Sequence, residues 1–264
     1  MKAPESALFS IARLETYRHD RKAHVTSKLA MATGFFYKTK HDGNEKIFLI
    51  TNKHVVFDKK EHYFPDKLSL YVHSDSHHLS KVKKIDLQLW DKSGKRLWKY
   101  SRIHSTVDVV ALEVKQESLD NCFYLTFSKA DILSDDINLA GKDIDLGMQL
   151  LVLGYPLDFY DEMNHFPITR TACVATWPWF NFNREPCFLI DARLHHGMSG
   201  SPVLSSPGSI HKTVKPSNQK VIKTEQDVFL LGVFSAEWHM RGEPLGLNVV
   251  WHANIIEEIV SSAV

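Results

Sequence analysis

A serine in a glycine-rich turn is the feature of this sequence that most directly suggests chemistry. Residues 197–202 spell Gly-Met-Ser-Gly-Ser-Pro, with Gly197 two positions before Ser199 and a glycine directly after it. Because glycine has no Cβ, Gly197 can direct its N–H into the same space as the N–H of Ser199. Two such donors form an oxyanion hole for acyl transfer. A plain Ser/Gly turn between two strands explains the same residues, so the segment alone leaves both interpretations open.

A serine nucleophile needs a base and a carboxylate that orients the base. Among the 15 histidines, His54 stands out because it follows an apolar, strand-like run at residues 47–50, after which the sequence becomes abruptly polar. Asp108 stands at the head of an apolar, β-branched run that ends at Val114. Burial alone would raise the pKa of Asp108, whereas a hydrogen bond from an imidazole N–H would favour its charged form. His54, Asp108 and Ser199 are therefore the candidate catalytic residues.

These motifs resemble those of the chymotrypsin-like (trypsin-like) serine protease family, nearest to its bacterial trypsin-like and Deg-type branch. Residues 51–54 (Thr-Asn-Lys-His) resemble the family's Thr-x-x-His motif, and residues 197–202 resemble its Gly-x-Ser-Gly-Gly-Pro loop. The order His, Asp, Ser is that of chymotrypsin, not that of the α/β-hydrolases. Residues 33–36, 151–156 and 231–235 also resemble strands of the family. No peptide-binding PDZ module is expected after the protease domain.

The resemblance implies an all-β fold with two six-stranded antiparallel β-barrels of the chymotrypsin type and a C-terminal α-helix. We expect the first barrel over residues 1–120, with His54 and Asp108, and an inter-barrel linker over residues 121–145. The second barrel, over residues 146–252, would carry Ser199, and the helix would take residues 253–264. The active site would then lie in the cleft between the barrels. A chain of 264 residues, 44% of them hydrophobic, is long enough to bury two such cores.

The local pattern of apolar residues independently favours strands, because the apolar runs are short and bounded by turn residues. Residues 35–37 and 47–51 predict a hairpin that turns at residues 42–43 (Asp-Gly). Residues 85–90 and 97–100 predict a second hairpin. The sequence is therefore typical of a mostly antiparallel β protein.

One helix is predicted at the C-terminal end. Asn254 is suited to cap it, and Glu257 follows three residues later. Its apolar face would consist of Ile255, Ile256, Ile259 and Val260.

The activity implied by the resemblance is that of a serine endopeptidase. His54 would take the proton of Ser199 as the hydroxyl attacks the peptide carbonyl, and Asp108 would stabilise the imidazolium. The N–H groups of Gly197 and Ser199 would bind the oxyanion. We expect no cofactor and no metal.

The resemblance also implies which residues line the primary specificity pocket: Arg193, Leu194, His196, Ser235, Ala236 and Glu237. Arg193 stands where trypsin-like enzymes carry their selecting acid, which indicates a preference for an acidic side chain next to the scissile bond. Glu237 stands where a glycine usually leaves the pocket open, and pairing between Glu237 and Arg193 is the opposing interpretation.

Two departures from the family bear on regulation. Met198 replaces the aspartate that in digestive members accepts the N-terminus released by zymogen cleavage, and a thioether cannot hold an ammonium group. We therefore expect no activation by N-terminal trimming. Residues 205–227 form a long polar loop, for which both a mobile flap at residues 208–223 and a disordered insert remain open.

The net charge of +1 gives no electrostatic reason to expect nucleic acid or membrane as a partner. The expected partner is a protein or peptide substrate, with an activating protein as a further possibility. A basic cluster at residues 81–99 fits either a solvated hairpin or a docking surface for an acidic partner. Without a recognisable signal peptide, the expected location is the cytoplasm.

The remaining histidines and the three cysteines suggest no cofactor. His73, His77 and His78 have the spacing of metal ligands only on a helix, whereas the preceding residues predict a strand and a solvated loop. Cys173 and Cys187 could lie on adjacent strands, and reduced core thiols are the default expectation for all three cysteines.

The alternative function is a latent or non-catalytic binding protein on a protease fold, which needs a partner to open its cleft. The sequence favours the enzyme because all three catalytic residue types are present.

Overall fold

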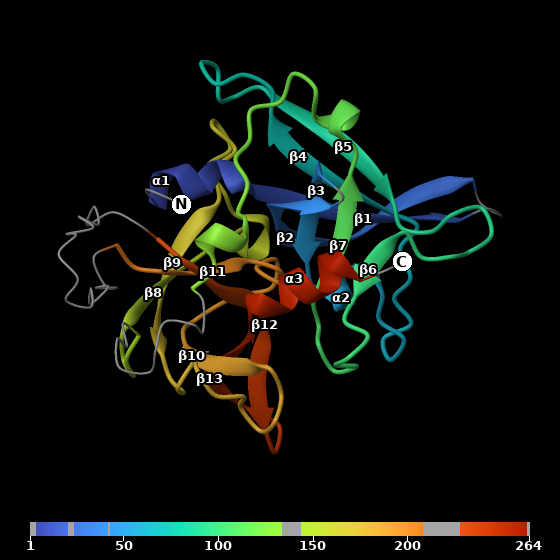
Figure 1. The fold of residues 1–264 in the computed structure, drawn as a ribbon. Coiled ribbons are helices and arrows are strands. Elements are labelled where there is room, and N and C mark those ends of the chain that lie inside the picture. The colour runs from blue at the N-terminus through green and yellow to red at the C-terminus, as the bar shows by residue number, and fades with distance from the viewer. Residues whose placement is uncertain (1–3, 21–23, 42, 134–143, 208–227, 263–264) are drawn as a thin grey trace.

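The computed structural model describes residues 4–20, 24–41, 43–133, 144–207 and 228–262. These residues form two antiparallel β structures that follow one another along the chain (Figure 1). The first is a seven-stranded sheet, and the second is a closed six-stranded barrel. The all-β fold class with two barrel-like halves and a C-terminal helix is therefore confirmed.

The first sheet has the strand order β5-β4-β1-β2-β3-β7-β6. Its strands are β1 (Ile11–Asp20), β2 (Val25–His41), β3 (Asn44–Thr51), β4 (Lys67–His73), β5 (Val82–Gln88), β6 (Trp98–Tyr100) and β7 (Val110–Val114). Its two edges meet where the N–H of Leu97 donates to the carbonyl oxygen of Leu89 at 3.0 Å. An isolated bridge between Trp90 and Arg96 adds to this contact. The sheet thus has one strand more than the six expected, and it curls until its edges touch.

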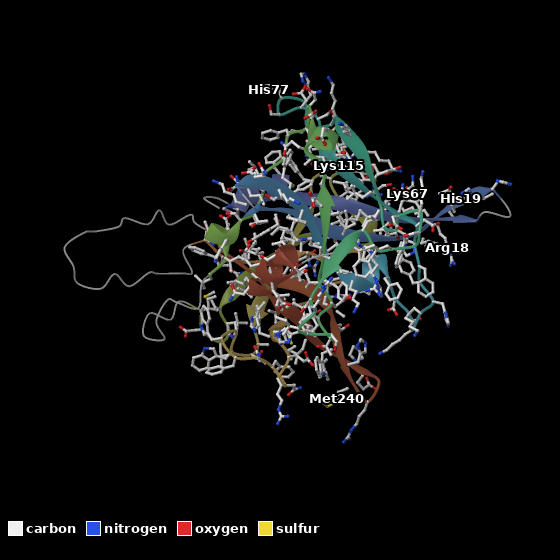
Figure 2. All side chains as sticks on the ribbon, turned by 45° about the vertical axis from the view of Figure 1, so that its right-hand side comes forward. Arg18, His19, Lys67, His77, Lys115 and Met240 are labelled. Carbon is white, nitrogen blue, oxygen red and sulfur yellow. The ribbon has the colours of Figure 1, made fainter. Side chains whose placement is uncertain are left out.

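The second barrel has the order β10-β13-β12-β11-β8-β9. Its strands are β8 (Gln149–Gly154), β9 (Ile168–Val174), β10 (Cys187–Asp191), β11 (Pro202–Ser205), β12 (Leu230–Met240) and β13 (Glu243–His252). The ends of β12 and β13 extend beyond the barrel as a ribbon, and Figure 2 shows Met240 at its tip.

The helices of the described residues are short, with at most eight residues in each. The α-helices are α1 (Pro4–Ala7), α2 (Lys53–Val56) and α3 (Asn254–Ser261), and the 3₁₀ helices are η1 (Leu8–Ser10), η2 (Gln116–Leu119), η3 (Lys129–Asp131) and η4 (Pro156–Asp158). Within the described ranges, none of the helices has the length and apolar character needed to cross a lipid bilayer.

Helix α3 joins the two halves. It buries Ile255, Ile256, Ile259 and Val260, as predicted, in a core that also contains residues of both β structures. The hydroxyl of Tyr37 on β2 donates to Glu257 at 2.5 Å. Burial raises the pKa of the Tyr37 hydroxyl, and its bond to the Glu257 carboxylate raises it further, so Tyr37 remains a donor. The predicted N-cap is wrong, because the helix begins at Asn254 and the cap position is Ala253, which has no side-chain cap.

The two predicted hairpins are confirmed to different extents. The first is confirmed, because β2 pairs with β3 from Phe35–Ile50 to His41–Asn44. The second is confirmed next to its turn, where Trp90 and Arg96 form an antiparallel bridge and the N–H of Leu97 donates to the carbonyl oxygen of Leu89. Farther from the turn the prediction is wrong, because β5 pairs with β4 and β6 pairs with β7.

The cysteines are free thiols in the structure. Cys173 and Cys187 do lie on the adjacent strands β9 and β10, but Cys173 pairs with Asp191 and Cys187 pairs with Trp251. Cys187 is buried, and burial raises the pKa of its thiol to about 11. Cys173 is exposed, so the expectation of a core thiol is wrong for that residue.

Candidate active site

His54 lies on α2, the single helical turn that follows β3. The next two residues, Val55 and Val56, are buried in the core of the first sheet and anchor this turn. Asn52 occupies the N-cap position of α2 without a side-chain cap, and its side-chain amide donates to the backbone oxygen of Asp108 at 2.7 Å. Asn52 therefore ties the segment before β7 to the helix that carries His54.

The carboxylate of Asp108 holds His54 at two points. Its Oδ1 accepts the backbone N–H of His54 at 2.9 Å, and its Oδ2 lies 2.6 Å from Nδ1 of the imidazole. Oδ2 also accepts the hydroxyl of Ser235 at 2.7 Å. Because an ionised carboxylate only accepts hydrogen bonds, Nδ1 must carry the proton, and Nε2 of a neutral ring is then a proton acceptor.

The pKa of His54 reflects this environment. Burial alone would lower it, but the hydrogen bond and the negative charge of Asp108 raise it above 6.5. The charge of Asp58 adds a smaller effect in the same direction. The site thus stabilises the imidazolium that forms when His54 accepts a proton.

Ser199 lies in the loop between β10 and β11, and its hydroxyl donates a long hydrogen bond of 3.4 Å to the carbonyl oxygen of Ser235. Gly200 follows with φ +88°, and an added Cβ there would lie 2.2 Å from the carbonyl oxygen of Thr33. Glycine is therefore required at this position both for its backbone angle and for space. Ser201 packs closely on Gly154, where an added Cβ would lie 2.2 Å from the Ser201 hydroxyl.

The backbone at Gly197 is fixed by contacts with residues 155–157. The carbonyl oxygen of His196 accepts the N–H of Leu157 at 2.7 Å, so the N–H of Gly197 points to the opposite side of that planar peptide. Gly197 has φ +91°, and an added Cβ would lie 2.3 Å from the carbonyl oxygen of Tyr155. The N–H of Met198 donates to His195 at 3.2 Å. Within the described ranges, the N–H groups of Gly197 and Ser199 donate to no protein acceptor.

Thr33 is a structural residue of the site that the sequence motifs did not identify. Its hydroxyl donates to the carbonyl oxygen of Gly197 at 2.8 Å and accepts the N–H of Tyr155 at 3.1 Å. Its own N–H donates to the carbonyl oxygen of Ser199 at 3.0 Å. Residues 33–36 were noted only for their resemblance to a strand of the family, and no sequence signal points to contacts 164 residues away.

A cavity of about 520 Å³ opens beside these residues. Its lining includes His54, His196, Gly197 and Ser199, together with Ala30 to Ala32, Val55, Asp58, Glu61, Tyr63 and Leu157. The structure thus brings His54 and Ser199, which are distant in sequence, to one solvent-accessible space, with Asp108 behind the imidazole.

Most of the residues predicted to form the specificity pocket lie outside this cavity. Arg193, Ala236 and Glu237 are exposed, Leu194 packs on the core of the second barrel, and Ser235 bonds to Asp108. The carboxylate of Glu237 accepts the N–H of Gly246 at 3.0 Å. In the described part of the chain, no ion pair joins Glu237 to Arg193, and the acidic preference stays a prediction.

The three histidines considered as metal ligands, His73, His77 and His78, do not line this cavity. His73 lies buried at the end of β4, with Nε2 2.7 Å from the carbonyl oxygen of Asn164, so a solvated loop is wrong for this residue. His77 and His78 are exposed, and Figure 2 shows His77 at the tip of the loop after β4. Among the described residues, no three His, Cys, Asp or Glu side chains form a metal-binding group.

The basic cluster at residues 81–99 is mostly engaged within the protein. Lys83 donates to backbone oxygens of Ser118 and Asp120, and Lys99 donates to those of Val260 and Ser262. Arg96 lies over the rings of Phe57, Trp98 and Tyr100. The long loop predicted as a flap, at residues 208–223, lies outside the described residues.

Comparison with known proteins agrees with this architecture. A family model, described as a trypsin-like peptidase domain, matches residues 32–211, which is more than half of the chain. The match includes His54, Asp108 and Ser199. No curated protein sequence matches the chain significantly. The fold and the family match together show that the chain belongs to the trypsin-like peptidase family.

Proposed function

We propose that this peptidase is a serine endopeptidase that hydrolyses peptide bonds through an acyl-enzyme, with Ser199 as nucleophile, His54 as base and Asp108 as the orienting carboxylate. The observation that carries the proposal is the double attachment of His54 to Asp108, through the backbone N–H and through Nδ1. This attachment fixes the ring and its tautomer beside a cavity that Ser199 also lines.

In the first half of the reaction, Oγ of Ser199 forms a bond to the peptide carbonyl carbon, and His54 Nε2 accepts the hydroxyl proton. The negative charge on the carbonyl oxygen is bound by the N–H groups of Gly197 and Ser199. The C–N bond then breaks, and His54 returns its proton to the leaving amine. Water repeats the sequence on the acyl-enzyme, which releases the acid and regenerates Ser199.

The hydrogen bond of Ser199 to Ser235 is compatible with this role. At 3.4 Å it lies at the long limit for a hydroxyl donor, so rotation of the Ser199 side chain toward His54 loses little. The bond from Ser235 to Asp108 is independent of that rotation and keeps Asp108 in place.

The proposal is tested by peptide hydrolysis with the purified chain and with the Ser199→Ala and His54→Ala variants. Each variant should lose about 10⁴-fold or more in kcat, because triad members act as a unit. Ser93→Ala, at an exposed turn, is the matched control and should retain full activity. Equal hydrolysis by wild type and Ser199→Ala would refute the proposal. A wild type that hydrolyses no peptide would instead favour the latent binding protein.

A further inference from the structure

The segment at residues 155–158 supports the oxyanion hole from outside the nucleophile loop. The N–H of Leu157 donates to the carbonyl oxygen of His196 at 2.7 Å and thereby sets the orientation of the peptide that ends in the Gly197 N–H. The carbonyl oxygen of Tyr155 lies directly against Gly197. A displacement of this segment would therefore move the Gly197 N–H without moving His54 or Asp108.

The segment has an unfavourable backbone conformation. Leu157 and Asp158 have φ +52° and φ +61°, two successive non-glycine residues in the left-handed region. Such residues persist only where the surrounding structure holds them. The Leu157 side chain is 64% exposed, so its packing does not hold the segment.

An ion pair from the other half of the molecule does hold it. Nε of Arg13 on β1 lies 2.5 Å from Oδ1 of Asp158, and Nη2 lies 2.8 Å from Oδ2. This bidentate geometry fixes both the position and the plane of the carboxylate. The Arg13 side chain is 13% exposed and that of Asp158 is 24% exposed, so water screens the pair only partly.

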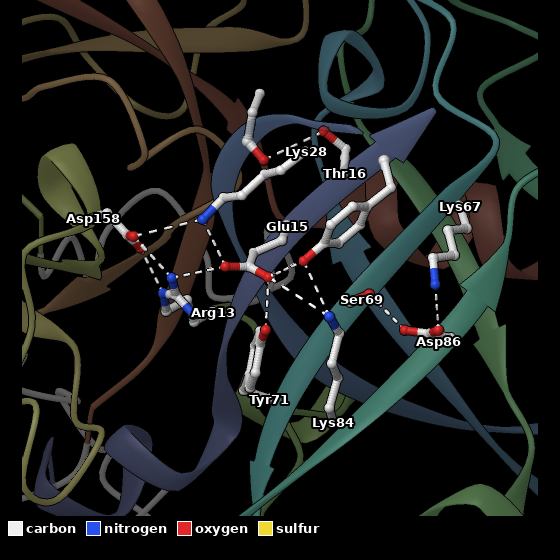
Figure 3. Close-up of polar contacts among 12 residues, drawn as sticks. Arg13, Glu15, Thr16, Lys28, Lys67, Ser69, Tyr71, Lys84, Asp86 and Asp158 are labelled. Atoms are coloured by element: carbon white, nitrogen blue, oxygen red, sulfur yellow. Dashed lines mark hydrogen bonds and ion pairs between the residues drawn. The ribbon is translucent and has the colours of Figure 1, made fainter. Parts of the chain in front are cut away.

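Arg13 is itself held by its surroundings (Figure 3). Its guanidinium lies 5.0 Å from the ring centroids of both Tyr71 on β4 and Tyr160, which follows η4. Nη2 also lies 2.9 Å from Oε1 of Glu15, which accepts Lys28 at 2.6 Å. On β1, Arg13 pairs across the sheet with Thr33, the residue that bonds to Gly197. The cluster is therefore continuous with the strand that supports the nucleophile loop.

We propose that Arg13 and Asp158 are positioning residues for the oxyanion hole: their ion pair keeps Leu157 in its left-handed conformation and so keeps the Gly197 N–H directed at the substrate. The inference rests on the proposed serine endopeptidase function. The Arg13–Asp158 pair also holds the nucleophile loop in a way that Met198 cannot, because the buried thioether of Met198 forms no ion pair with a chain terminus. The hole is thus assembled by an interaction between two distant parts of the intact chain.

Kinetics of Asp158→Asn and Arg13→Lys test the proposal. Asparagine removes the charge at constant shape, and lysine keeps the charge but loses the bidentate fork. We expect kcat to fall about 100-fold in Asp158→Asn, since a misplaced group near the reacting atoms costs about that much. Arg13→Lys should lose roughly tenfold, with KM changed little in both variants.

A peptide boronate separates positioning from a general loss of structure. Its tetrahedral adduct places an oxygen in the oxyanion hole, so its affinity should fall by the same factor as kcat. The acid limb of the pH profile should not move, because His54 and Asp108 are untouched. Asp86→Asn is the matched control: it removes an ion pair on the same face, between Lys67 and Asp86 at 2.5 Å, that has no contact with residues 155–158 (Figure 3). It should lose stability without losing boronate affinity.

A crystal structure of Asp158→Asn gives a readout that does not depend on activity. The proposal predicts that Leu157 leaves the left-handed region and that the His196 carbonyl loses its bond to the Leu157 N–H. Unchanged kcat, boronate affinity and loop geometry in Asp158→Asn would overturn it. An inactive wild type would refute the proposed function instead, and the crystal structure would still decide whether the ion pair positions the loop.

Discussion

Thr33 donates its side-chain hydroxyl to the carbonyl oxygen of Gly197, at 2.8 Å, from a strand in the opposite half of the molecule. The same hydroxyl accepts the N–H of Tyr155, and the N–H of Thr33 donates to Ser199. One fully buried residue therefore connects β2 to both ends of the segment that carries the proposed nucleophile.

Replacing Thr33 with valine should lower both stability and activity. Valine has a similar shape but leaves the Gly197 oxygen and the Tyr155 N–H without their partner, at a cost of about 1–3 kcal/mol for each group. We expect the free energy of unfolding, measured in urea, to fall by about 2–6 kcal/mol, together with a loss of kcat. Thr33→Ser keeps the hydroxyl and should retain most of the activity. Equal stability of Thr33→Val and Thr33→Ser would contradict this role.

The pH dependence of kcat/KM should respond to Asp58. His54 acts as a base only when neutral, so the acid limb follows its pKa, which lies above 6.5. Asp58 stabilises the charged imidazolium, and Asp58→Asn should therefore shift the acid limb to lower pH. Glu61→Gln, in the same cavity, serves as the control and should leave the limb in place. A shift to higher pH in Asp58→Asn would show that the sign of this effect is wrong.

Ser235→Ala should lower kcat by roughly tenfold or more, because a hydrogen bond to a charged group contributes about 1.5–3 kcal/mol. The hydroxyl of Ser235 donates to Asp108 at 2.7 Å. Ser101→Ala is a close control, since Ser101 is also buried and donates to the carboxylate of Glu258 at 2.6 Å. Thermal unfolding should detect both changes, whereas steady-state kinetics should detect only the first. Equal kcat in the two variants would exclude a role for Ser235 in holding Asp108.

Glu15 should make the protein sensitive to acid. Burial opposes its ionisation, but hydrogen bonds from Lys28, Tyr17 and Tyr71 and the charge of Arg13 lower its pKa from 4.5 to about 2. A carboxyl group with a depressed pKa contributes stability that is present above its unfolded value and is lost as pH falls through the folded one.

The free energy of unfolding should thus decline between about pH 4.5 and pH 2 in the wild type. The decline should be shallower in Glu15→Gln, which should also be less stable at neutral pH. Glu45→Gln, at an exposed pair with Lys38, should follow the wild-type curve. Parallel curves for wild type and Glu15→Gln would show that Glu15 has an ordinary pKa.

The parts of the site that the sequence predicted are those with a local signal. His54, Asp108 and Ser199 each stand next to a recognisable run: a strand followed by a polar turn, the head of a β-branched strand, and a glycine-rich loop. The β2–β3 hairpin and the apolar face of α3 were predicted for the same reason, since period and turn chemistry are contained within a few residues.

The parts that could not be predicted depend on contacts between distant residues. Arg13 and Asp158 are 145 positions apart, and neither has a neighbour that distinguishes it from a surface charge. The hairpin at residues 89–97 stays short because β5 pairs with β4 and β6 pairs with β7, and these partners are distant in sequence from its turn. The bond from the Asn52 amide to the backbone oxygen of Asp108 likewise joins residues 56 positions apart.

Labelling with a fluorophosphonate probe, followed by mass spectrometry of the peptides, measures whether Ser199 is a nucleophile, because the probe reacts only with an activated serine beside an accessible oxyanion hole. We expect a single adduct on Ser199, its loss in His54→Ala, and slower labelling in Asp108→Asn. Labelling that is absent from Ser199 in the folded wild type, or that is equally fast in His54→Ala, would contradict the proposed roles of Ser199 and His54.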